Sequence, residues 1–107
     1  MKLWHKQLEG RFSTFPAEQQ LLMVCNELNR AHHQLDDTRE YRNCLKRSLE
    51  LMDFLISDRK WQPKLKEILR AREVIAQYYL LPPRDTKSLQ RQLIQLNRDA
   101  WRMVKDD

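Results

Sequence analysis

Apolar residues recur along this chain in four stretches, each with the three- and four-residue spacing of an amphipathic helix. The first stretch follows Pro16, and its stripe consists of Leu21, Cys25, Leu28 and Leu35. Pro16 suits a first helical turn, where its missing N–H costs little, and Ser13 or Thr14 is the expected cap. The pattern therefore predicts a helix from Pro16 to about Leu35.

A second apolar stretch follows, but its phase does not continue the first stripe. Its stripe consists of Tyr41, Cys44, Leu45, Ser48, Leu51, Met52, Leu55 and Ile56. Asp37 and Glu40 have the spacing of a capping box, which marks the start of a helix. We therefore expect the chain to break near Asp36–Asp37. One long helix from Pro16 to Ser57 is the alternative, because no glycine or proline interrupts that span.

A polar segment that ends before Pro63 predicts a loop, and a third helix is expected from there to about Leu80. The stripe of this helix consists of Leu65, Ile68, Leu69, Ile75, Ala76 and Tyr79. Arg72 falls within the same stripe. We expect its stem to lie on the core and its guanidinium to reach water. The alternative is a buried ion pair with Glu18 or Glu27 of the first helix.

Pro82-Pro83 ends the third helix, and Asp85 or Thr86 is the expected cap of a last helix that continues to about Met103. The stripe of the last helix consists of Leu89, Leu93, Leu96, Ala100 and Met103. A further short amphipathic helix is expected near the N-terminus, ending close to Gly10. Its apolar residues are Leu3, Trp4, Leu8 and Phe12.

Gly10 is the only glycine in the 107 residues. A β-rich domain of this length needs glycine at its tight turns, where φ must be positive. Leucine, glutamine, arginine and lysine are abundant instead, and all of them are good helix formers. The composition therefore predicts an all-α fold. We expect one domain over residues 1–107, built as a four-helix bundle or a close relative with a short extra N-terminal helix.

The sequence contains no catalytic signature, and we favour a protein that is not an enzyme. A phosphate-binding loop rich in glycine is impossible here. None of His5, His32 and His33 follows a glutamate by three residues, as the ligands of di-iron bundles do. No metal or cofactor is therefore expected. His32 lies on the apolar stripe of its helix, and we expect a histidine at the edge of the core that bonds to a neighbouring helix.

Cys25 and Cys44 both fall on apolar stripes, where a cysteine usually behaves as a small buried hydrophobe. The N-terminal segment lacks the apolar run of a signal peptide. No stretch approaches the roughly 20 apolar residues of a membrane-spanning helix. These features predict a cytoplasmic protein that does not act at a membrane.

Some apolar residues fall outside the core stripes. Trp61 is expected in the loop, and Ile94 and Trp101 stand about 130° from the leucine stripe of the last helix. A second apolar face that stays exposed usually marks an interface. The leading hypothesis is a small helical interaction module that contacts another protein, with a homodimer preferred, through Val74, Tyr78, Ile94 and Trp101. Alternatively, the N-terminal apolar residues cover these positions within the chain.

The formal charge of +5 is unevenly distributed. Residues 16–37 contain four acidic residues against one arginine, whereas residues 59–83 contain six basic residues against two glutamates. In the last helix, five basic residues fall within about 60° of one another and opposite the leucine stripe. They are Lys87, Arg91, Arg98, Arg102 and Lys105. Because such a line suits a phosphate backbone, the alternative function is nucleic-acid binding through Lys87, Arg91, Arg98 and Arg102.

Overall fold

The computed structural model describes residue 8 and residues 10–104, and these residues contain helices and no strand. In chain order the elements are the 3-10 helix η2 (Phe12–Thr14), the α-helices α1 (Ala17–His32) and α2 (Thr38–Ile56), the 3-10 helix η3 (Arg59–Lys64), and the α-helices α3 (Leu65–Leu80), α4 (Lys87–Ile94) and α5 (Arg98–Val104). The prediction of an all-α fold is confirmed. The predicted N-terminal helix falls mainly on residues 1–7 and 9, which lie outside the described part of the chain.

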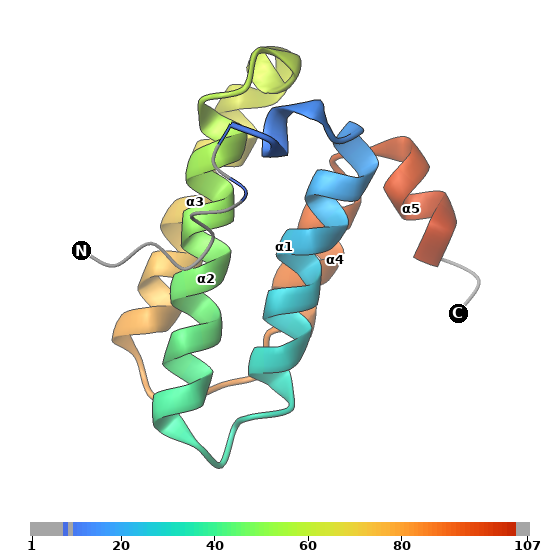
Figure 1. The fold of residues 1–107 in the computed structure, drawn as a ribbon. Helices are drawn as coiled ribbons and strands as arrows, with labels where there is room; N and C mark the ends of the chain where they lie inside the picture. The colour runs from blue at the N-terminus through green and yellow to red at the C-terminus, as the bar shows by residue number, and fades with distance from the viewer. Residues whose placement is uncertain (1–7, 9, 105–107) are drawn as a thin grey trace.

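Helices α1 and α2 form a central antiparallel pair (Figure 1). Helix α3 packs against α2, and α4 packs against α1, so these four helices make the predicted bundle. Helix α5 lies beside the N-terminal half of α1 (Figure 1). The interface between α3 and α4, called the α3–α4 seam below, is small, because these two helices make few contacts with each other.

The core is built from the apolar stripes of the four bundle helices. Its fully buried side chains include Leu21, Val24, Leu28, Leu45, Leu51, Met52, Leu55, Ile68, Ile75 and Leu93. Burying a side chain of this kind stabilises the fold by about 1.5–3 kcal/mol relative to leaving it in water. Leu69 departs from the predicted stripe of the third helix, because 47% of its surface is exposed.

The predicted break between the first two helices is confirmed, which excludes a single long helix. Residues 33–36 form turns, and Asp37 is the N-cap of α2. Its carboxylate accepts a hydrogen bond of 3.1 Å from the backbone N–H of Glu40. The expected cap of α1 is wrong, since Pro16 occupies that position and the Thr14 hydroxyl donates back to the carbonyl of Arg11.

The predicted loop before the third helix is instead the 3-10 helix η3, and it contains Pro63. Trp61, which falls outside the predicted core stripes, is only 3% exposed. Its indole N–H donates to Gln20 Oε1 at 2.7 Å. The Gln20 amide in turn donates to the carbonyl of Phe12 at 2.7 Å and to Asp58 Oδ2 at 3.0 Å. Gln20 therefore ties α1 to both 3-10 helices with polar groups that are buried but satisfied.

The single last helix that we expected is wrong: the chain turns at residues 95–97 and divides into α4 and α5. Asn97 Oδ1 accepts a hydrogen bond of 2.8 Å from the backbone N–H of Ala100, which is how an N-cap begins a new helix. With 8 residues α4 is roughly 12 Å long, whereas α3, with 16 residues, is roughly 24 Å long. The fourth helix therefore covers only part of the third.

Arg72 pairs with neither of the glutamates that we considered. Its guanidinium donates to the two carboxylate oxygens of Asp53 in α2, at 2.6 and 3.3 Å. The side chain is 36% exposed, so the guanidinium reaches water as expected. Its pKa is raised by the hydrogen bond to Asp53, against an opposing effect of burial.

His32 lies at the edge of the core, with 20% of its side chain exposed. Its Nδ1 is 3.1 Å from Asp85 Oδ1, but the two atoms lack the geometry of a hydrogen bond. The expected bond to a neighbouring helix is therefore replaced by a contact with the segment that precedes α4. The next residue, Thr86, anchors this segment, because its buried hydroxyl donates to the Leu28 carbonyl at 2.6 Å. Of the two predicted caps of α4, Thr86 is the N-cap residue but its side chain makes no capping hydrogen bond, whereas Asp85, one residue earlier, accepts from the backbone N–H of Lys87 at 2.8 Å.

Candidate binding site

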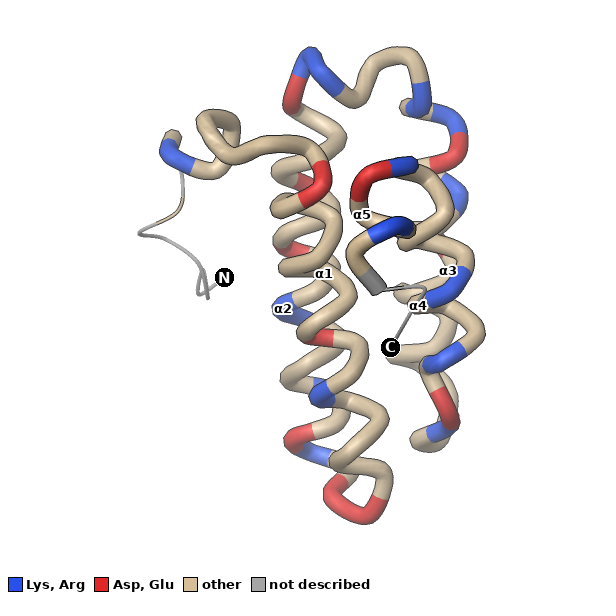
Figure 2. The backbone as a smooth tube through the Cα atoms, turned by 90° about the vertical axis from the view of Figure 1, so that its right-hand side faces the viewer, with Lys and Arg blue, Asp and Glu red and all other residues tan. Residues whose placement is uncertain are grey.

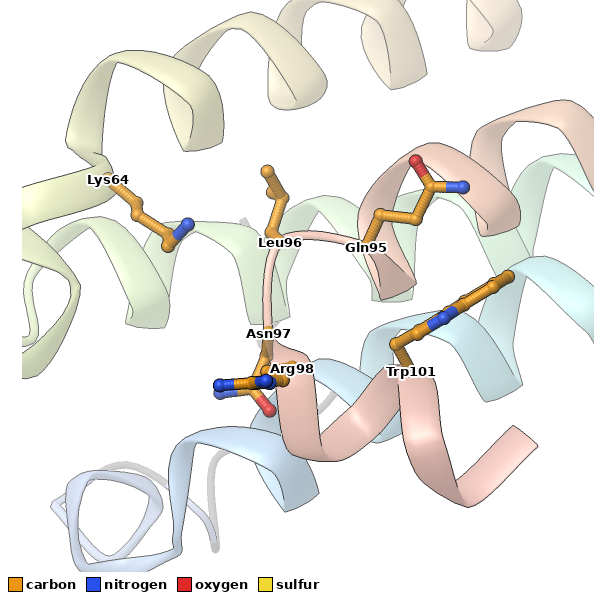
Figure 3. Close-up of a pocket in the computed structure, with 6 residues that line it drawn as sticks. All are labelled: Lys64, Gln95, Leu96, Asn97, Arg98 and Trp101. Carbon is orange, nitrogen blue, oxygen red and sulfur yellow. The ribbon is translucent and has the colours of Figure 1, made fainter. Parts of the chain in front are cut away.

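A hollow of about 520 Å³ lies where the chain turns from α4 into α5 (Figure 3). It is lined by Lys64, Gln95, Leu96, Asn97, Arg98 and Trp101. Figure 3 shows Lys64 on one side, Gln95 and Trp101 on the other, and Leu96 between them. The residues come from the end of η3, from the turn and from α5. The hollow therefore joins positions more than 30 residues apart in the sequence.

The division of the last helix creates this hollow. The turn at residues 95–97 separates α5 from α4, and α5 packs against α1. Ala100 is fully buried, so α5 is fixed to the core on one side. Trp101, the next residue, lines the hollow and remains 37% exposed. The cap at Asn97 and the buried alanine thus set the position of the Trp101 backbone.

Two cations of the hollow are available to a ligand. Lys64 and Arg98 are both exposed, and neither makes an ion pair with a carboxylate in the part of the chain that the structure describes. Exposed cations without a partner attract an anion most strongly at low ionic strength. Because they belong to different elements, they flank the hollow rather than follow one helix face.

Neutral groups of the hollow complement these charges. Gln95 is exposed and carries both a donor and an acceptor. Asn97 uses its oxygen as the cap of α5, which leaves its N–H₂ group for a ligand. Leu96 is half-buried and gives the hollow an apolar centre. The site thus combines positive charge, amide hydrogen-bonding groups and an aromatic ring.

The predicted basic residues of the last helix are distributed over two helices. Lys87 and Arg91 lie four residues apart on the exposed face of α4, and Gln95 continues that line into the hollow. Arg98 and Arg102 are exposed on α5. None of these four cations pairs with a described carboxylate. Lys105, the fifth member of the predicted line, lies outside the described residues.

Basic residues also lie along α3. Figure 2 shows Lys and Arg on α3, α4 and α5, with fewer acidic residues between them on α3 and α5, while acidic residues mark the turn between α1 and α2. In α3 the exposed cations that have no described carboxylate partner are Lys66 and Arg70. We call the exposed cations on α3, α4 and α5, together with the hollow, the basic surface. Its members are Lys64, Lys66, Arg70, Lys87, Arg91, Arg98 and Arg102.

The apolar residues predicted to bind a partner do not form one exposed face. Ile94 is only 5% exposed, because α4 is flanked by α1, α3 and α5 and buries more than one stripe. Val74 and Tyr78 are half-buried and pack against the core. The Tyr78 ring also lies 5.7 Å from the guanidinium carbon of Arg84. Of the four predicted contact residues, Trp101 alone is exposed.

The described part of the N-terminal segment packs against other parts of the same chain. Phe12 is 2% exposed, and its ring lies 5.4 Å from that of Phe54 in α2 and 6.0 Å from that of Phe15. Leu8 is partly buried against the core. Leu3 and Trp4 lie outside the described residues. The segment therefore covers α2 rather than the α3–α4 seam.

The cysteines are buried and lack the features of a nucleophile. Both thiols are free. Burial raises the pKa of Cys25 to about 12. Burial also raises the pKa of Cys44, although the neighbouring Arg47 opposes that effect. A reactive thiol has a lowered pKa and partial exposure, which neither cysteine combines.

A cluster of charges joins α1 to α2 away from the basic surface. Glu27, whose side chain is only 6% exposed, accepts from Arg47 at 2.7 Å and from Arg30 at 3.1 Å. Arg47 also donates to Glu40 at 2.9 Å, and that hydrogen bond lowers the pKa of Glu40. These charges satisfy one another, so the cluster is part of the helix packing. Among the described residues, no group of three or more histidine, cysteine or acidic side chains is arranged to hold a metal ion.

Sequence reasoning missed Lys64, Gln95 and Asn97 as members of a site. A local signal for the turn was present, because Asn97 is a favourable N-cap and Asp99 stands in the first turn of the new helix.

None of the described helices combines the length and the apolar character that crossing a bilayer requires. No protein family, curated protein or solved structure matches this chain.

Proposed function

We propose that the protein is a small helical interaction module and that its ligand is a nucleic-acid strand, bound along the basic surface. The observation that carries this proposal is the hollow at the α4–α5 turn. There the cations Lys64 and Arg98, which pair with no described carboxylate, line the same hollow as the exposed Trp101. Positive charge along a groove, combined with an aromatic side chain, is the usual chemistry of strand binding.

The charges favour an extended anion over a small one. Lys87 and Arg91 lead along α4 toward the hollow, and Arg98 and Arg102 continue beyond it on α5. A strand that follows this line meets a cation on each helix. Each phosphate that a lysine or arginine neutralises releases counterions, so affinity falls steeply as salt rises.

The apolar residues support a protein partner less well. Ile94 and Trp61 are buried, and Val74 and Tyr78 are half-buried against the core. An apolar interface would need a contiguous exposed patch that these residues do not supply. All four predicted basic residues, in contrast, are exposed.

The test is the affinity of the full chain for a fluorescently labelled oligonucleotide as a function of salt. We expect binding at about 50 mM salt that weakens steeply as salt is raised. Arg98→Gln should weaken binding and flatten the salt dependence. Arg39→Gln is the matched control, because it also removes one exposed arginine near a helix start but lies at the α1–α2 end of the bundle. Absence of binding at about 50 mM salt would contradict the proposal.

Self-association is a second candidate, supported by the exposed apolar side chains of α5. Trp101 is 37% exposed and Met103 is 60% exposed. Light scattering at micromolar concentration tests this candidate, and a dimer that Met103→Lys dissociates would support it. A monomer at all concentrations would remove it.

The compartment that we propose is the cytoplasm, because the two cysteines are free thiols and reducing compartments keep thiols in that state.

A further inference from the structure

We infer that the hollow takes an unpaired nucleotide, with its base stacked on Trp101 and its flanking phosphates between Lys64 and Arg98. The inference rests on the proposed nucleic-acid function and makes it more specific. It predicts that the protein binds single strands in preference to duplexes.

The size of the hollow fits one nucleotide better than a helix of nucleic acid. At about 520 Å³ it lies within the range of about 300–1,000 Å³ that is typical of small-molecule pockets. The bases of a duplex are stacked on one another and present only their edges. A base reaches the indole of Trp101 only when it leaves such a stack, as it does in an unpaired strand.

The backbone of Trp101 is held in place before any ligand arrives. Its backbone N–H donates to the Asn97 carbonyl at 3.0 Å, and its neighbour Ala100 is fully buried. The indole is therefore carried by a backbone that is fixed to the core through Ala100. A stacking residue on an ordered helix loses less backbone entropy on binding than one on a mobile loop.

The remaining lining matches the other parts of a nucleotide. Lys64 and Arg98 approach from different elements, which suits a phosphate backbone that passes between them. Gln95 and the N–H₂ group of Asn97 offer hydrogen bonds to the edge of a base. Leu96, which lies between Lys64 and Gln95 in Figure 3, offers an apolar contact to the ligand. Stacking of this kind tolerates every base, because each has a π-face.

The experiment measures the affinity of labelled oligothymidylate and oligouridylate of about 12 nucleotides, and of a DNA duplex of the same length, at one salt concentration. The DNA and RNA single strands share the chemistry that the hollow recognises. We expect both to bind more tightly than the duplex. Trp101→Leu should weaken single-strand binding about five- to 100-fold, the effect of losing one stacked base, while changing duplex binding little.

Two further variants make the result specific to stacking. Trp101→Phe keeps an aromatic face and should retain most of the single-strand affinity. Met103→Leu, which changes another exposed apolar residue of α5, should have no effect. Circular dichroism of each variant establishes that the helices are intact, and the preference of the wild type for single strands over the duplex carries the test if Trp101→Leu unfolds.

The possible outcomes separate the inference from the function on which it rests. Preference for single strands together with the loss in Trp101→Leu supports both. Equal binding of single strands and duplex, unchanged in Trp101→Leu, overturns the stacking inference and leaves the nucleic-acid function intact. Binding of neither overturns the function, and the inference with it.

Discussion

The side-chain oxygen of Asn97 accepts a hydrogen bond from the backbone N–H of Ala100 at 2.8 Å, and Ala100 is fully buried. This pair both begins α5 and fixes it to the core. The chain leaves the line of α4 at this point, and Trp101 lines the hollow on the side opposite Lys64 (Figure 3). The cap and the packing of Ala100 therefore together set the position of α5 at the hollow.

Replacing Asn97 tests this relationship. Asn97→Ala removes the cap acceptor and should reduce the free energy of unfolding by about 1 kcal/mol, whereas Asn97→Ser keeps an acceptor and should cost less. Urea unfolding measures the difference. Equal stability of the two variants would show that the cap contributes nothing.

Gln20 is expected to be the most sensitive polar residue of the core. Gln20→Leu leaves the indole N–H of Trp61 buried without a partner and removes one of the two hydrogen bonds to the Phe12 carbonyl, which should cost about 1–3 kcal/mol. The cost should be smaller in a Trp61→Phe background, because that variant no longer has the indole N–H to satisfy. A double-mutant cycle from urea unfolding measures this coupling. A coupling of zero would contradict the described network.

The stability of the protein should depend on Asp58 in acid. Burial opposes ionisation of Asp58, but hydrogen bonds from Lys60 and Gln20 outweigh it, and the pKa lies below its ordinary value of 3.8. A lowered folded-state pKa contributes stability that is complete above the unfolded-state pKa and is lost as the pH falls through the folded-state value. The wild-type free energy of unfolding should therefore fall below about pH 4.

Asp58→Asn should be less stable than wild type at neutral pH and should show a flatter pH dependence in that range. Glu73→Gln removes an exposed acidic group that has no described ion pair, and it serves as the control. Urea unfolding at several pH values between about 3 and 7 measures both effects. The same acid dependence in Asp58→Asn and wild type would exclude Asp58 as its source.

The two thiols should react slowly in the native protein. Cys25 and Cys44 are 8% and 1% exposed, and burial raises the pKa of both. The thiolate is the reactive form, so labelling with a thiol reagent should wait for the chain to open. The rate should rise sharply in denaturant. Rapid labelling of the native protein by either cysteine would contradict the described packing.

Local signals were enough to predict much of the fold. The helix stripes follow a period that burial imposes, and Asp37 caps α2 through a contact only three residues away. The fold class, the break between α1 and α2 and the burial of both cysteines depend on such signals. They are therefore readable from a short window of sequence.

The site depends on longer-range interactions. A straight helix is also compatible with the spacing of Leu89, Leu93 and Ala100. The packing of α5 on α1 therefore decides that the helix ends and that Asn97 caps a new one. Trp61 is buried, and Gln20, 41 residues away, accepts its N–H. Ile94 is buried on α4, a helix that three other helices contact. The apolar pattern of a single helix does not indicate these contacts between elements.

The most direct test of the account is to map the ligand onto the protein by NMR. Oligothymidylate is titrated into the ¹⁵N-labelled chain at low salt, and the amide and indole shifts are followed. We expect the largest changes at Lys64, at residues 95–98 and at the indole of Trp101. The turn at residues 33–37 should not respond. Changes that centre on that turn, or no changes at all, would contradict a nucleic-acid site at the α4–α5 hollow.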